Sequence, residues 1–99
     1  METGVVIPLE ELAQRIPDGC RLAMPKDVSG PSLAAVRELL LRGVRNLHLV
    51  CVPVGGLAAD LLIGAGAIAT LETSAVTLGE LGSAPRFTAA VREGRLRML

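Results

Sequence analysis

Aromatic residues are almost absent from this 99-residue chain, which has no Trp, no Tyr and a single Phe, Phe87. Apolar residues nevertheless make up 51% of the sequence, so its core must be built from Leu, Val, Ile and Ala. Aliphatic residues of this kind are typical of strands that are buried between helices. The lack of an aromatic stacking platform and of a basic cluster argues against a nucleic-acid partner.

Net charge is also absent, because 10 basic and 10 acidic residues cancel. A near-zero net charge with a high apolar content favours association, either with another copy or with a partner. Cysteine is scarce, and the two thiols, Cys20 and Cys51, each lie in an apolar run. We expect both to be buried and unreactive rather than joined in a disulfide.

A membrane segment and a signal peptide are both missing from the pattern. The first residues are acidic rather than basic, unlike the start of a signal peptide. The apolar stretch Leu47–Leu71 contains Pro53 and a central Asp60. An Asp at the bilayer centre costs about 2.5–3.5 kcal/mol, so we interpret the stretch as two buried elements with a loop between them. We therefore expect a cytoplasmic protein with no membrane contact.

Short apolar runs alternate with helical patterns along the whole chain. The expected helices are Leu9–Ile16, the residues from Pro31 to Gly43, Ala58–Ile63 and the residues from Pro85 to Gly94. The expected strands are Cys20–Met24, Leu47–Val52, Ala67–Leu71 and Arg95–Leu99, with the first three as neighbours at the centre of the sheet. This alternation predicts an α/β fold: a Rossmann-like parallel sheet with helices on both faces and right-handed crossovers.

Ligands of such sheets bind beyond the carboxyl ends of the strands. Three loops are expected there: Pro25–Gly30, Pro53–Gly56 and Glu72–Leu78. The candidate binding residues in these loops are Pro25, Lys26, Asp27, Ser29, Gly30, Gly55, Gly56 and Glu72. We interpret Glu72 as an exposed loop residue, with a catalytic carboxylate as the alternative.

Other chemistry-bearing residues have simpler interpretations. The segment Gly64–Ala67 ends a helix and leads into a strand, which is the reverse of a dinucleotide-binding glycine motif, so it indicates a turn. His48 has no ligand at metal-binding spacing and is interpreted as a strand residue rather than a metal ligand or general base. Asp60 suits the positive end of a helix dipole. No metal-binding or P-loop pattern is present, so no metal site is predicted.

An ordered succession of short segments resembles a known family. The segments are Asp18-Gly19, Val36-Arg37-Glu38-Leu39, Asn46-Leu47, the run Ala59–Gly66, Glu72-Thr73-Ser74 and Ala84-Pro85-Arg86-Phe87. In this order, and over about residues 9–99, they resemble the α-subunit of family I coenzyme A transferases, in particular the glutaconate CoA-transferase branch. The resemblance covers only the N-terminal part of such subunits. It therefore implies that residues 1–99 are a single, incomplete CoA-transferase-like domain.

The resemblance also implies an activity and a partner. Such enzymes move CoA between an acyl-CoA and a small carboxylic or dicarboxylic acid, with CoA as substrate and no bound cofactor. Their catalytic glutamate lies on a β-subunit in a Glu-Asn-Gly context, which this chain lacks, so no catalytic residue is assigned here. Where relatives carry a Gly-Gly-Phe loop, this chain has Pro25, Lys26 and Asp27, and a proline has no N–H to offer an oxyanion.

Two further functions stay open. The chain is either a truncated, non-catalytic paralogue that acts as an interaction subunit, or a component of a related acyl-CoA lyase or hydrolase. A neighbouring reading frame that encodes a β-like subunit with Glu-Asn-Gly would favour the transferase over the interaction subunit.

Overall fold

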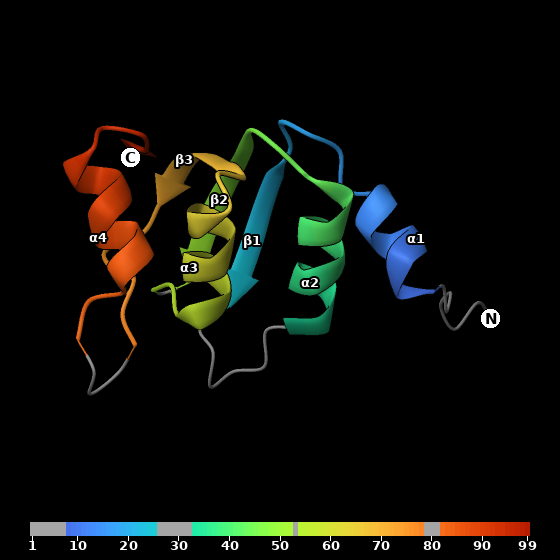
Figure 1. Cartoon of the computed structure of the whole chain (residues 1–99), viewed down its shortest axis with the longest axis horizontal. Helices are drawn as coiled ribbons and strands as arrows, with labels where there is room; N and C mark the ends of the chain where they lie inside the picture. Colours follow the sequence, from blue (N-terminus) through green and yellow to red (C-terminus); the bar gives the residue numbers. More distant parts are fainter. Residues whose placement is uncertain (1–7, 26–32, 53, 79–81) are drawn as a thin grey trace.

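The structure is a computed structural model that describes residues 8–25, 33–52, 54–78 and 82–99. Helices and strands alternate from one end to the other (Figure 1). The helices are α1 (Leu9–Gln14), α2 (Leu33–Arg42), α3 (Leu57–Gly64) and α4 (Pro85–Arg92). The strands are β1 (Arg21–Pro25), β2 (Leu47–Val52), β3 (Ile68–Glu72) and β4 (Arg97–Met98). The predicted order of elements is thus confirmed.

The four described strands form one parallel sheet in the order β1-β2-β3-β4. The three main strands are neighbours, as predicted, although β1 lies at an edge of the described sheet. The fourth strand is shorter than the expected Arg95–Leu99. A Schellman motif explains this, because Arg95 N–H still donates to Ala90 O at 2.9 Å and Gly94 has a φ of 70°. Strand β4 therefore begins at Arg97, two residues later than the sequence pattern indicates.

One face of the sheet is packed and the other is open within the described residues. Side chains of β2 alternate: Leu47, Leu49 and Cys51 are buried, whereas Val52 is 56% exposed. Each crossover advances the sheet in the same direction, so right-handed crossovers place α2, α3 and α4 on the same face. In Figure 1 these helices lie side by side, in a row in front of the strands. Helices for the second face, which a three-layer arrangement requires, are not among the described residues.

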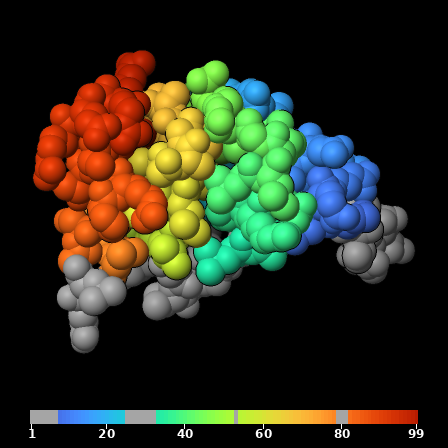
Figure 2. Space-filling model, in the orientation of Figure 1, coloured from blue at the N-terminus to red at the C-terminus, as the bar shows by residue number. Residues whose placement is uncertain are grey.

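The core is aliphatic, as the composition predicts. Four leucines are completely buried between the sheet and the helices: Leu47, Leu49, Leu62 and Leu71. Helix α3 lies at the centre of the row, and five of its eight residues are buried. Truncating a buried leucine to alanine typically destabilises a protein by about 2–5 kcal/mol, so these positions hold the layers together. Figure 2 shows the outer surface of the row, running from α4 through α3 and α2 to α1.

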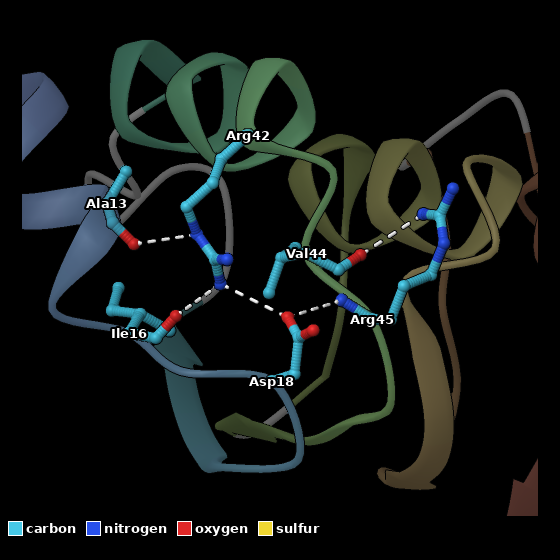
Figure 3. A network of polar contacts seen from close by, with 6 residues as sticks. All are labelled: Ala13, Ile16, Asp18, Arg42, Val44 and Arg45. Carbon is cyan, nitrogen blue, oxygen red and sulfur yellow. Dashed lines mark hydrogen bonds and ion pairs between the residues drawn. The ribbon is translucent and has the colours of Figure 1, made fainter.

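Helix α1 is attached to α2 by a polar network at the amino edge of the sheet (Figure 3). Its six residues are too few to form a stable helix alone. The Arg42 guanidinium donates to Ala13 O at 3.2 Å and to Ile16 O at 2.5 Å, which satisfies carbonyl groups at the end of α1. It also contacts Asp18 Oδ1 at 3.3 Å, and the same oxygen accepts a hydrogen bond from Arg45 N–H at 3.0 Å. The Asp18-Gly19 segment therefore serves the fold.

None of the helices in the described residues has the length and apolarity needed to cross a lipid bilayer.

Candidate functional site at the carboxyl edge of the sheet

Four of the eight candidate binding residues lie outside the described residues: Lys26, Asp27, Ser29 and Gly30. Their role in the loop after β1 remains a prediction. Pro25 is the last residue of β1, and in the register of the sheet it is the partner of Val52 at the end of β2. The loop thus starts at the carboxyl edge, where the sequence places it.

Gly55 lies where two chain segments approach closely. Its N–H donates to Ala75 O at 2.9 Å, and its carbonyl accepts from Thr77 N–H at 3.0 Å. A Cβ at this position would come within 3.0 Å of both Ala59 Cβ and Cys51 Sγ. Packing therefore favours a glycine here, because a Cβ would force these neighbours to shift. Gly56 is likewise buried, at the start of α3, and its carbonyl accepts the first helical hydrogen bond, from Asp60 N–H at 3.0 Å.

The loop after β3 is held against the loop after β2. Thr73 Oγ1 donates to Ala75 O at 2.9 Å and accepts from Ala75 N–H at 3.3 Å, which folds the chain into a tight turn. Val76 then pairs with Gly55 in a parallel bridge, in which Ala75 O accepts from Gly55 N–H and Thr77 N–H donates to Gly55 O. Two of the three predicted loops are therefore adjacent, as the edge of a parallel sheet requires.

Cys51 is buried just below this edge and is free of any disulfide, as is Cys20. Burial raises the pKa of the Cys51 thiol from 9.0 to about 11, and a hydrogen bond with the Thr73 side chain partly opposes the rise. The thiol is consequently protonated at neutral pH and is a poor nucleophile. Cys51 matches the expected buried, inert thiol, whereas Cys20 is only half-buried.

Glu72 differs from its interpretation as an exposed loop residue. It is the last residue of β3, and its Oε1 lies 2.6 Å from His48 Nε2. Both side chains lie on the open face, because His48 is paired with Thr70 and Glu72 follows two positions later. The sequence analysis missed this pair because its members are 24 residues apart. His48 itself is the half-buried strand residue that the pattern predicts.

Asp60 is the one charged residue in the described core, with 1% of its surface exposed. Its Oδ1 accepts a hydrogen bond from Phe87 N–H at 2.7 Å, and its Oδ2 accepts one from Arg86 N–H at 3.4 Å. These groups lie in the first turn of α4, whose own cap residue, Ala84, has no side-chain acceptor. Asp60 lies in the first turn of α3, as its dipole interpretation requires, but it also caps a second helix.

The helix α3 to α4 contact explains part of the family resemblance. A Cβ on Gly64 would approach Arg86 Cδ to 2.4 Å, so only a glycine lets the arginine side chain cross the end of α3. Gly66 has a φ of 74°, which confirms the interpretation of this segment as a turn. The run Ala59–Gly66 and the segment Ala84-Pro85-Arg86-Phe87, distant in the sequence, thus form a single packing unit.

Apart from the His48–Glu72 pair, the described edge offers backbone groups and packing surfaces. Of the candidate binding residues that the structure describes, only Glu72 is ionisable, and it is engaged by His48. No group of three His, Cys, Asp or Glu side chains in the described ranges is arranged to hold a metal ion. The edge is therefore suited to shape one wall of a site.

Comparison with solved structures identifies the type of fold. The chain matches a cysteine-to-serine variant of the decarboxylase AibA/AibB with a TM-score of 0.82 and 31% sequence identity, over 99% of its own length. The fold is CoA-transferase-like. This chain spans only 38% of the length of the matched chain. No protein-family model and no curated protein matches it.

Proposed function

We propose that this chain is an α-subunit-like component of a CoA-transferase-like enzyme, and that its carboxyl edge forms one wall of an acyl-CoA site. The proposal is supported above all by the match to AibA/AibB over nearly the whole chain at 31% identity. The two-part name of that decarboxylase is consistent with an enzyme that is assembled from more than one component.

The reacting groups come from the partner. In the described residues, the Cys51 thiol is protonated at neutral pH, and Glu72 is hydrogen-bonded to His48. A transferase of this family needs a carboxylate that attacks the acyl-CoA and divides acyl transfer into two easier steps. The sequence contains no Glu-Asn-Gly segment, so a β-like subunit supplies that carboxylate. This chain acts by shaping and positioning.

Two reaction classes use such a site. The family resemblance favours transfer of CoA between an acyl-CoA and a small carboxylic or dicarboxylic acid. The matched structure is a decarboxylase, which favours a lyase reaction instead. A partner with a Glu-Asn-Gly segment would select the transferase, because decarboxylation needs no acyl–enzyme intermediate.

The test is acyl-CoA binding by the chain in complex with a co-expressed β-like subunit, with acetyl-CoA as the probe. Ser74 is exposed in the loop after β3, and Ala65 is exposed at the opposite edge, after α3. A Ser74→Glu substitution places a negative charge at the carboxyl edge, where it would repel the phosphates of a bound acyl-CoA, and we expect an affinity loss of about tenfold. The matched Ala65→Glu substitution should leave the affinity unchanged. Equal affinities for the two variants would refute a site at the carboxyl edge.

A further inference from the structure

A row of polar residues crosses the open face of the sheet, one from each strand. The register pairs Arg21 with His48, His48 with Thr70, and Thr70 with Arg97. His48 lies on the face opposite the buried Leu47 and Leu49, so the whole row lies on the open face. Arg21 and Arg97, which are its two ends, are exposed, and neither forms an ion pair with another described residue.

An apolar strip lies beside this polar row, toward the carboxyl edge. It consists of Ala23, Val50 and Val52, of which Ala23 and Val52 are exposed and Val50 is half-buried. Glu72 lies next to the strip, and its carboxylate is already bonded to His48. The open face therefore presents an aliphatic surface and two positive charges that form no ion pair with another described residue. Parallel sheets are almost always covered on both faces, so this surface requires a cover.

A second copy of the chain is a poor cover for this face. A twofold axis brings the same patch of each copy together, which would place the arginine row of one copy against that of the other. Like charges in direct contact oppose association. The larger part of the matched AibA/AibB chain, by contrast, has no counterpart in these 99 residues. A helix that lies outside these 99 residues can supply the missing layer, which satisfies both observations.

We propose that a helix of a partner polypeptide covers the open face, with carboxylates directed at Arg21 and Arg97 and aliphatic side chains against Val50 and Val52. This inference rests on the proposed function, since it describes how the partner of that enzyme docks. A helix is the element that packs on a parallel sheet, and its two periodic faces can present acidic and apolar residues together. The two arginines fix the orientation of the helix, and the valines supply buried area.

The test uses two synthetic helical peptides with the same leucine face, one with glutamates and one with lysines on the flanks. Each is titrated into the isotope-labelled chain while backbone amide resonances are followed by NMR. The glutamate peptide should shift the amides of Arg21, His48, Thr70 and Arg97, and the lysine peptide should not. A second titration with acetyl-CoA follows the amides of residues 54–56 and 73–76. The docking face and the proposed substrate edge are thereby tested separately.

Charge reversal at the row provides the decisive variant. The double substitution Arg21→Glu and Arg97→Glu should weaken binding of the glutamate peptide by at least about tenfold. The matched control, Arg37→Glu and Arg92→Glu, reverses two exposed arginines on the helical face and should change the affinity less than about twofold. Equal binding of both peptides, or shifts confined to the helical face, would overturn the proposal. A concentration-dependent dimer of the chain that the row variant abolishes would also overturn it. So would acetyl-CoA shifting the amides of the polar row as much as the glutamate peptide does.

Discussion

Replacing Asp60 by alanine should destabilise this protein more than any other single change of a charged residue in its described part. Asp60 is 1% exposed and accepts hydrogen bonds from the backbone N–H groups of Phe87 and Arg86. Alanine removes the cap of α4 and leaves these partly buried donors without their acceptor. The Arg86 guanidinium, 4.0 Å from Oδ2, also loses its counter-ion.

The magnitude follows from two contributions. Loss of a helix cap typically destabilises a protein by about 1 kcal/mol. An unsatisfied buried donor adds about 1–3 kcal/mol. We therefore expect the free energy of unfolding to fall by about 2–4 kcal/mol for Asp60→Ala. Asp60→Asn keeps an oxygen acceptor for Phe87 N–H but loses the charge, so its effect should be about half as large.

The assay is urea unfolding followed by circular dichroism, with amide hydrogen exchange at Phe87 and Thr88 as a local measure. A fall of 2–4 kcal/mol is a large part of the roughly 5–15 kcal/mol that stabilises a typical domain, so the variant should be close to unfolding. Glu11→Ala removes an exposed ion pair with Arg15 and serves as the control, with an expected change below about 0.5 kcal/mol. If Asp60→Ala and Glu11→Ala are equally stable, or if exchange at Phe87 is not accelerated, the capping role is refuted.

Three further predictions address the thiol, the amino edge and the activity. Because the folded state holds the Cys51 proton up to a pKa of about 11, against 9.0 for the free thiol, stability should fall by about 2 kcal/mol as pH rises from 9 to 11, and Cys51→Ala should abolish that fall in urea titrations. Arg42→Ala should lower stability by about 1–2 kcal/mol and accelerate amide exchange in α1; unchanged exchange there would contradict the network. The chain alone should not transfer CoA from acetyl-CoA or glutaryl-CoA to an acceptor acid, and turnover above the no-protein rate that a substitution in this chain abolishes would overturn that expectation.

Local patterns were sufficient to predict the elements because each is marked by nearby residues. Leu47–Val52 is an apolar run that ends before Pro53, and the structure places β2 over the same residues. The start of β4 was harder to predict. Gly94 ends α4 as predicted, but the Schellman bond from Arg95 N–H to Ala90 O keeps Arg95 at the helix end, so β4 begins at Arg97.

The contacts that sequence reasoning missed all join residues that are far apart in the chain. His48 and Glu72 are 24 residues apart, and they meet only because of the register between β2 and β3, which includes an irregularity after Leu47. Asp60 and Phe87 are 27 residues apart and meet because α3 and α4 are adjacent. Spacing rules cannot detect such pairs. Asp60 and Phe87 both lie in segments that carry the family resemblance, but the resemblance does not show that they are in contact.

The open face links these results to the function of the chain. Aliphatic composition alone indicates strands that are buried on both faces. A purely aliphatic sheet face could pack against a covering helix in many orientations. The sequence instead places Arg21, His48, Thr70 and Arg97 in one row across that face. Unpaired charges penalise every docking that leaves them without a carboxylate, so they select one partner and one orientation. Because β2 and β3 contribute to both the open face and the carboxyl edge, a partner seated on that face is also placed beside the proposed acyl-CoA site.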